Sequence, residues 1–383
     1  MEVFVITPLP LSILHHFAAL EDPRVDRTRQ HHLVDLVAIA LCGVICGANN
    51  WSAIVLWGQT NHNWLATFLE LPNGIPSHDT FGRVFALLDP EQFAACFTGW
   101  MAAVCQRLGL KQVAIDGKAL RRSHNRSKGQ AALHLVSAWS VENGLTLGQR
   151  AVDGKSNEIT AIPALLQLLD VSGALVTIDA MGCQKDIAAA IRAVKADYLL
   201  AVKENQPHLY EDIEGIMARA RDTDFVGVKY SYAEESGRDH GRVEQRYCWV
   251  FDDLSTIRDR ALWADLKSIV VVVSTRTVGD KSSSETRYYI SSRAADATVL
   301  TQAVRRHWSI ENECHWVLDV CFREDDSRLR EGHGASNFAL LRKAALALLK
   351  KAEGVKEGIE CRRLVAGWDK TYLLKVLLGY EAD

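Results

Sequence analysis

Apolar side chains recur every three to four residues through the first quarter of the chain, which is the spacing of helices. The pattern predicts helices over residues 31–47 and 51–71. Residues 72–76 contain two prolines and a glycine and break the pattern, and Ser77 stands where the cap of a following short helix belongs. We therefore predict an all-α N-terminal domain over residues 1–107.

The periodicity changes to that of strands at residue 113. Five apolar or alternating runs predict strands: residues 113–115, 133–141, 145–152, 174–178 and 198–202. Asn143-Gly144 joins the second and third runs and is a typical hairpin turn. Helical patterns separate the later runs, so the order is strand, hairpin, helix, strand, helix, strand. We predict an α/β fold over residues 108–207, with a mixed sheet and flanking helices.

Two further segments complete the predicted organisation. Residues 208–295 are charged and contain strand-like pieces, which predicts a β-rich insertion that extends the sheet. Residues 296–383 return to helical periodicity and are predicted to complete the same core. Three arginines of the insertion are candidate contacts to a phosphate backbone: Arg238, Arg242 and Arg246. Because Glu244 lies among them, a self-paired surface hairpin is an equal alternative.

Composition adds few constraints. The net charge of -3 gives no global attraction for a polyanion, so any such partner must be bound by local basic patches. No apolar run is long enough to span a membrane, and no leader pattern precedes the first helix, so we expect a soluble, cytoplasmic protein. The nine cysteines include no CxxC pair, which predicts buried, reduced thiols.

Two of the predicted strands end in an aspartate followed by small residues. Asp116 follows the run 113–115, and Asp179 follows the run 174–178. A carboxylate at the end of a buried strand needs a cation or hydrogen bonds to be tolerated. Two carboxylates at neighbouring strand ends form a hard oxygen site suited to Mg²⁺ or Mn²⁺.

The candidate for a third carboxylate is Glu311. It lies in a long helical pattern over residues 299–320, where His307, Glu311 and His315 are spaced four apart and are expected to share one face. The stripe could bind a transition metal by itself, although HExxH is absent, and Glu311 could also be an ordinary surface residue. Three carboxylates just beyond the helix compete with it: Glu324, Asp325 and Asp326.

Basic side chains near these positions are candidate contacts to a phosphate backbone. The loop over residues 118–128 is densely basic and directly follows Asp116. The short helix after Ser77 could read DNA as part of a helix-turn-helix, or it could be an ordinary packed helix. The candidate residues are Lys118, Arg121, Arg122, Lys203, Arg305, Arg306, His307, Ser77 and Arg83.

Several motifs in register resemble one protein family over nearly the whole chain. They are DPRVDRTRQHHL, GIPSHDTFGRVFALLDP, VAIDGKALRRS, LVTIDAMGCQKDIA, YLLAVKENQP, HGRVEQR and RRHWSIENECHWVLDVCFREDDSRLR. This set resembles the ISAs1 family, with its H-repeat-associated proteins, within the IS4-like DDE transposases. The resemblance implies a ribonuclease-H-like core, and an enzyme that cuts and joins DNA at the ends of an insertion sequence.

The resemblance also implies roles for particular residues and partners. Asp116, Asp179 and Glu311 would be the acidic residues that hold two Mg²⁺ (or Mn²⁺) ions, with Asp116 bridging them. The partners would be double-stranded DNA, both terminal inverted repeats and target, and a second copy of the chain in a homodimer. IS4-type enzymes carry a tyrosine, an arginine and a lysine around the glutamate, and this chain lacks that set; Arg305, Arg306 and His307 are the substitutes.

Three other functions stay open at this point. The first is an inactive, transposase-derived DNA-binding protein, and the second is a ribonuclease-H-like nuclease that cuts without joining. The third is an α/β phosphatase, which is disfavoured because no second aspartate follows Asp116 closely and no Gly-rich phosphate loop is present.

Overall fold

The computed structural model describes residues 13–125, 129, 131–152, 158–239 and 241–379. Residues 126–128 of the predicted basic loop lie outside this part. Within the described part, no helix combines the length and the apolar character needed to cross a membrane. The cytoplasmic location stays a prediction.

The first part of the described chain is helical, as its periodicity predicts. It contains α1 (Ile13–Phe17), α2 (Leu33–Ile45), α3 (Trp51–Thr60), α4 (His62–Leu65), α5 (His78–Leu87) and α6 (Pro90–Leu108). Ser77 caps α5, because its hydroxyl accepts a hydrogen bond from the Thr80 N–H at 3.2 Å. Asp89 caps α6 in the same way, and Pro90 occupies the first turn.

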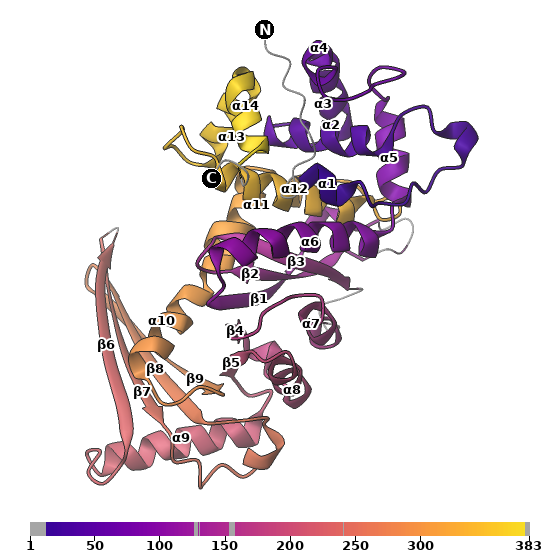
Figure 1. The fold of residues 1–383 in the computed structure, drawn as a ribbon. Coiled ribbons are helices and arrows are strands. Elements are labelled where there is room, and N and C mark those ends of the chain that lie inside the picture. Colours follow the sequence, from indigo (N-terminus) through magenta and orange to yellow (C-terminus); the bar gives the residue numbers. More distant parts are fainter. Residues whose placement is uncertain (1–12, 126–128, 130, 153–157, 240, 380–383) are drawn as a thin grey trace.

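A nine-stranded mixed sheet forms the centre of the molecule (Figure 1). Its strands are β1 (Gln112–Ala119), β2 (His134–Ser140), β3 (Leu145–Val152), β4 (Leu175–Ile178), β5 (Asp197–Val202), β6 (Tyr230–Asp239), β7 (Arg242–Phe251), β8 (Ser268–Val278) and β9 (Lys281–Ser291). The spatial order is β3-β2-β1-β4-β5-β9-β8-β7-β6. β4 lies parallel to β1 and β5, whereas β2 lies antiparallel to β1. This confirms the predicted mixed sheet.

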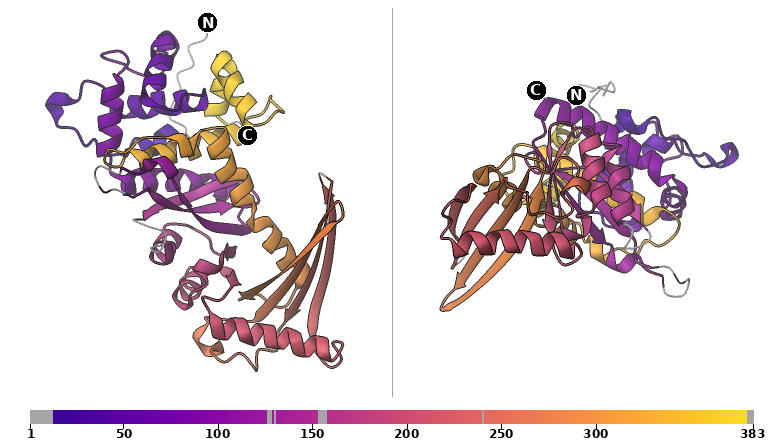
Figure 2. Two further views of the ribbon diagram at one scale, coloured as in Figure 1. Left: turned by 180° about the vertical axis from the view of Figure 1, so that it is seen from behind. Right: turned by 90° about the horizontal axis from the view of Figure 1, so that it is seen from below.

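Helices cover both faces of the sheet. α7 (Glu158–Leu166) and α8 (Lys185–Ala193) bury apolar residues with one face of β1, β2 and β4. The β-rich insertion extends the sheet through antiparallel pairing of β5 with β9, and α9 (Pro207–Asp222) packs beside it. α10 (Ala297–His307) lies against the other face of the insertion strands (Figures 1 and 2).

The C-terminal helical pattern is interrupted. After α10 the chain forms a π-helical turn (Ile310–His315), then α11 (Trp316–Val320), a short 3-10 turn (Glu324–Asp326), α12 (Gly334–Lys351), α13 (Ile359–Trp368) and α14 (Lys370–Leu377). The predicted helical pattern over residues 299–320 is helical in the structure, with a π turn in place of a regular α turn at Ile310–His315. A π turn contains one more residue in each hydrogen-bonded ring than an α turn.

The helices at the two ends of the chain share one core. Buried residues of α1 to α6 form a single apolar cluster with buried residues of the π turn and α11 to α14. Trp51 illustrates this, because its ring packs on Phe85 of α5 and on Phe338 of α12. The proposed division at residues 107, 207 and 295 stays a prediction, and the packing shows that the first and last helical segments are one body.

Asn337 of α12 joins these two segments most directly. Its buried amide donates hydrogen bonds to the carbonyls of Phe85 and Leu88, at 2.9 Å each, where α5 ends. These carbonyls have no partner within their own helix. Asn337→Ala should therefore lower the free energy of unfolding by about 2–3 kcal/mol, since a buried acceptor left unpaired costs about 1–3 kcal/mol.

The measurement is the urea midpoint by circular dichroism, with Asn61→Ala as the control. The Asn61 amide donates to the Trp57 carbonyl one turn away and is less buried, so its loss should cost under about 1 kcal/mol. Equal effects of the two substitutions would show that the α5–α12 connection contributes no special stability.

Candidate active site

Asp116, Asp179 and Glu311 line one small pocket of about 180 Å³, which we call the carboxylate pocket. Lys203 and His307 lie on its wall. Asp116 comes from β1, Asp179 directly follows β4, and Glu311 comes from the π turn. The structure thus brings together all three predicted carboxylates from distant parts of the chain.

The strand register explains why the two aspartates meet. β1 and β4 are parallel neighbours in which Ile115 pairs with Ile178, so the residues that follow, Asp116 and Asp179, are adjacent. β1 does not end at Asp116, as its apolar run suggested, but continues to Ala119. It continues because β2 pairs with it along its whole length. Asp116 therefore lies within a strand, where it is more enclosed than at a strand end.

This enclosure perturbs Asp116 strongly. Burial, together with the negative charges of Asp179, Glu311 and Glu158, raises the pKa of its carboxyl to about 7, although a backbone hydrogen bond from Gly117 acts in the opposite direction. Asp179 and Glu311 are exposed side chains at the pocket mouth. A carboxyl group that lines a pocket, and whose pKa is shifted by burial and by nearby charges, is a candidate functional residue.

His315 contacts Asp116 from the side of the helical layer. Its Nδ1 lies 3.4 Å from Asp116 Oδ2, and the imidazole is buried. Burial, together with the positive charges of Lys343 and Lys118, lowers the pKa of His315 to about 3, so the ring is neutral. Within the described residues its Nε2 has no hydrogen-bond partner. His315 is the third residue of the predicted stripe, and it contacts Asp116, which lines the carboxylate pocket together with His307 and Glu311.

Gly117 is required behind the carboxylate pocket. A Cβ at this position would lie 2.7 Å from His134 Nε2 and still closer to the Glu158 carboxylate. His134 and Glu158 are both buried and form a hydrogen-bonded pair there. Any side chain at residue 117 would displace this pair, and with it the backbone on which Asp116 sits.

The donor set of the carboxylate pocket suits a hard divalent cation. Three carboxylates supply only oxygen ligands, which is the preference of Mg²⁺ and Mn²⁺. Among the residues that the structure describes, no three His, Cys, Asp or Glu side chains are gathered closely enough to hold an ion. The three carboxylates thus share a pocket without forming a closed coordination site, and Asp179 and Glu311 are exposed enough to rotate towards Asp116.

Lys118 and Glu324 pair with each other instead of serving the predicted site. Lys118 Nζ binds Asp319 and lies 2.9 Å from Glu324 Oε2, and Glu324 is buried. Burial disfavours ionisation of Glu324, but Lys118, Lys343 and Arg342 outweigh it, so the pKa of Glu324 is lowered. We therefore withdraw Lys118 as a DNA contact. Glu324 does not line the carboxylate pocket, which favours Glu311 as the third carboxylate.

Four other predicted arginines are exposed and already have acidic partners. The pairs are Arg121–Asp325 at 3.1 Å, Arg122–Asp326 at 3.5 Å, Arg305–Glu235 at 3.8 Å and Arg306–Glu142 at 3.2 Å. Exposed pairs of this kind are weak and can exchange for phosphate. Ser77 and Arg83 lie away from the carboxylate pocket and line a separate groove.

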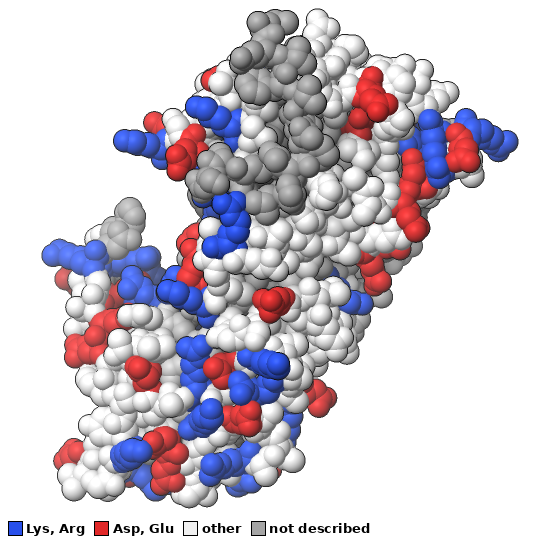
Figure 3. Space-filling view, in the orientation of Figure 1, with Lys and Arg blue, Asp and Glu red and all other residues white. Residues whose placement is uncertain are grey.

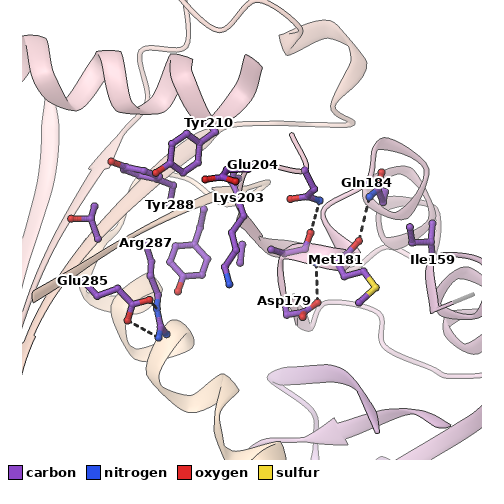
Figure 4. Close-up of a pocket in the computed structure, with 16 residues that line it drawn as sticks. Ile159, Asp179, Met181, Gln184, Lys203, Glu204, Tyr210, Glu285, Arg287 and Tyr288 are labelled. Carbon is purple, nitrogen blue, oxygen red and sulfur yellow. Dashed lines mark hydrogen bonds and ion pairs between the residues drawn. The ribbon is translucent and has the colours of Figure 1, made fainter. Parts of the chain in front are cut away.

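His307 cannot act as a cation in the pocket. Its Nδ1 lies 2.9 Å from the Thr177 hydroxyl, and burial lowers its pKa to about 4. It can therefore offer a hydrogen bond but no charge near neutral pH. Among the described residues, two cations line the carboxylate pocket, Lys203 and Arg287. Figure 4 shows the Lys203 side chain extending towards Asp179, in an adjoining pocket that Arg287 also lines.

A basic trough of about 760 Å³ lies beside the carboxylate pocket, and we call it the arginine trough. The sequence had marked Arg242, Arg246 and Arg305 as candidate contacts, but not Arg276 and Arg287, which only the fold places beside them. Its charged lining residues are Arg242, Glu244, Arg246, Arg276, Glu285, Arg287 and Arg305. Arg242 and Arg246 both pair with Glu244, at 3.2 and 2.6 Å. Figure 3 shows basic side chains around the free ends of β6 to β9, with acidic ones among them.

The arginine trough arises because the insertion strands are longer than α10 can cover. On β7, Val250 and Cys248 pack under α10, and the next outward positions on the same face are Arg246, Glu244 and Arg242. On β8 and β9 the residues of this face likewise change from apolar to polar beyond Val272. The polar half of this face meets the carboxylate pocket at Arg287 and Trp308, which line both.

The sheet order β3-β2-β1-β4-β5, with β2 antiparallel and aspartates on β1 and after β4, is that of a ribonuclease-H-like fold. Comparison with known families narrows this class. Residues 82–348 match the family described as the transposase DDE domain, and residues 14–101 match the region described as DDE_Tnp_1-associated. The chain belongs to this family of DDE DNA transposases.

The names of individual relatives agree with this family. The chain is 40% identical to the "Putative transposase YncI" of Escherichia coli O157:H7 over 97% of each chain. It is 38% identical to the "H repeat-associated putative transposase YhhI" of Escherichia coli K12, over 96% of this chain and 98% of the relative. A solved piggyBac transposase synaptic complex with hairpin DNA has a TM-score of 0.44 and 10% identity, over 98% of this chain and 78% of its own. That likeness is too weak to support an argument.

The raised pKa of Asp116 predicts how stability changes with pH. A carboxyl with a folded-state pKa of about 7 and an ordinary value of 3.8 binds its proton more tightly when folded. The stability that this proton contributes is therefore lost as pH rises from about 4 to about 7. Asp116→Asn removes this dependence, so the variant should gain stability relative to wild type across this range. At about 1.4 kcal/mol per pKa unit, the gain reaches at most roughly 4 kcal/mol.

The measurement is the urea midpoint of both proteins at a series of pH values, with chelator and with Mg²⁺. Bound Mg²⁺ selects the ionised carboxylate, so it should stabilise wild type most above pH 7 and Asp116→Asn very little. A constant difference between the two proteins across the pH series would contradict the raised pKa.

Proposed function

We propose that this transposase cuts DNA strands at the ends of an insertion sequence and joins them to target DNA, using Asp116, Asp179 and Glu311 with two Mg²⁺ or Mn²⁺ ions. The observation that carries the proposal is the carboxylate pocket, where three acidic side chains converge and where burial and the other carboxylates raise the pKa of Asp116. A cation favours the ionised form of a carboxyl group, so a bound metal ion would offset this cost.

The chain's own residues divide the work of holding the ions. Asp116, at the centre, would bridge them, Asp179 would bind one, and Glu311 the other. When bound, such ions would supply the positive charge that activates an attacking oxygen and stabilises the leaving oxygen of a phosphodiester. His315 fixes the Asp116 carboxylate from behind through the 3.4 Å contact, and Lys203 would bind a non-bridging phosphate oxygen on the Asp179 side. No protein side chain serves as a nucleophile.

Double-stranded DNA, as terminal repeats and as target, is the proposed substrate. The arginine trough opens onto the carboxylate pocket, so a strand leaving the pocket would meet Arg287 and Arg305 first. Arg306, Arg121 and Arg122 are exposed, and their weak ion pairs can exchange for phosphates. Because the reaction joins two DNA ends, we propose that two copies of the chain act together as a homodimer.

Three substitutions test the assignment of the carboxylates. Asp116→Asn and Glu311→Gln should each lower Mg²⁺-dependent cutting of element-end DNA by at least about a hundredfold, since each removes a ligand charge, while duplex binding stays near wild type. Glu324→Gln instead removes the buried carboxylate that pairs with Lys118, so it should lower stability by about 3 kcal/mol while folded protein still cuts. The assays are single-turnover cleavage and urea unfolding.

The outcomes separate the remaining alternatives. Undiminished cutting by Asp116→Asn would reject the proposed site. Loss of cutting in folded Glu324→Gln but not in Glu311→Gln would show that Glu324, and not Glu311, is the third carboxylate. Strand transfer of the cut end into a second duplex should accompany cutting. Cutting without transfer would indicate a nuclease, and salt-sensitive binding without cutting would indicate an inactive DNA-binding protein.

A further inference from the structure

A second, larger groove lies at the far side of the helical layer. It measures about 1120 Å³ and is formed between α5 and the segment that leads from the turn Glu324–Asp326 into α12. We call it the α5 groove. None of its lining residues lines the carboxylate pocket or the arginine trough. Its basic residues are Arg83 on α5 and Arg328 and Arg330 on the opposite segment.

One wall of the α5 groove is the outward face of α5. Phe81, Val84 and Phe85 bury the inward face of this helix in the shared core. The opposite stripe, at helical spacing, is Asp79, Gly82, Arg83 and Ala86, and all four line the groove. Because Gly82 and Ala86 are small, the floor between Arg83 and the other wall stays open.

The other wall is fixed to α5 by close backbone contacts. Gly332 has a φ of +47°, and a side chain there would collide with the Ala86 carbonyl oxygen. The next residue, His333, donates its backbone N–H to the same carbonyl at 3.0 Å, and Asn337 caps the end of α5. The two walls therefore form one rigid surface that needs no rearrangement to bind a ligand.

The arginines of the α5 groove differ from those beside the carboxylate pocket in having no counter-ion. Within the described residues, no carboxylate forms an ion pair with Arg83, Arg328 or Arg330, whereas Arg121, Arg122, Arg305 and Arg306 all have one. The ion pairs of the latter group are described above. Like charges gathered without counter-ions repel one another, and a polyanion relieves this repulsion.

Two acidic residues also line the α5 groove, and they do not cancel its charge. Asp79 lies 3.4 Å from His78 at the start of α5, and Glu331 is exposed at the rim. Three arginines against two carboxylates leave an excess of positive charge on a surface of a chain whose net charge is -3. The excess is therefore local, as expected for a site that binds an anion.

We propose that the α5 groove binds the sugar–phosphate backbone of duplex DNA, at a site separate from the carboxylate pocket. The proposal rests on the proposed function, because it takes DNA as the ligand. Arg330 links the groove to the pocket side: its Nε donates to the Arg122 carbonyl at 3.2 Å, in the loop that follows β1. A duplex bound in the groove would thus extend along a basic path towards the strand that carries Asp116.

The test compares two triple variants that remove the same charge. Arg83, Arg328 and Arg330→Gln alters the groove, and Arg219, Arg221 and Arg260→Gln alters the exposed region at α9, at the opposite end of the molecule (Figure 1). Binding of a duplex is measured with chelator present over about 50 to 200 mM salt. Each lost phosphate contact lowers the slope of log affinity against log salt by about 0.9, so the groove variant should lose up to about 3 units of slope.

The groove variant should also bind at least about tenfold more weakly near 100 mM salt, and the α9 control should match wild type. Both variants should keep the wild-type circular dichroism spectrum and urea midpoint. At saturating DNA the groove variant should keep the wild-type cutting rate with a raised KM, because its substitutions do not touch the carboxylate pocket.

Failure of the groove proposal can be distinguished from failure of the proposed reaction. A groove variant with the wild-type salt slope, or a control with the same loss as the groove variant, would overturn the groove proposal even if wild type cuts DNA. Loss of binding in the groove variant alone, together with a wild type that binds but never cuts, would support the groove and overturn the proposed reaction. A wild type with no salt-dependent duplex binding would overturn both.

Discussion

A carboxyl group on a central strand of the sheet, whose pKa is raised by burial and by acidic neighbours, is the constraint that organises this molecule. Asp116 and Lys118 lie two residues apart on the same face of β1, yet their surroundings differ. Lys118 and buried Glu324 neutralise each other, and Lys343 and Arg342 add positive charge nearby. Burial and three nearby carboxylates raise the pKa of Asp116, whereas that of Glu324 is lowered. The protein itself balances the charge of Glu324, and Asp116 is the carboxylate that we propose a metal ion balances.

The positions of the other acidic groups follow from how three segments meet at this strand. Parallel pairing of β1 with β4 fixes Asp179 beside Asp116, and this depends only on backbone register. The position of Glu311 depends instead on the π turn, which also places His315 in contact with Asp116. Because a π turn is less stable than a regular helical turn, its presence is consistent with a functional constraint at this point. The same helix delivers Trp308 to the boundary between the carboxylate pocket and the arginine trough.

Local pattern was sufficient to predict the sheet and its two aspartates, because buried strands have a strong apolar signature and the family motifs fix their order. The local pattern failed where a side chain's environment is set by a residue far away in the sequence. Lys118 looked like a free cation of a basic loop, but Glu324, 206 residues on, binds it. The spacing of His307, Glu311 and His315 predicted one shared face, but not that His315 contacts Asp116 on a distant strand. Nothing in the local pattern marks Arg328 and Arg330, since only the fold places them opposite Arg83.

The single apolar cluster shared by the first six helices and the last four has a consequence for biosynthesis. Trp51, Phe85 and their neighbours leave the ribosome early, yet the helix that covers them, with Phe338 and Asn337, is translated near the end. The apolar faces of the early helices therefore stay uncovered until almost the whole chain has been translated. A prematurely terminated product would expose those faces and become a substrate for chaperones and proteases, rather than a partly working enzyme.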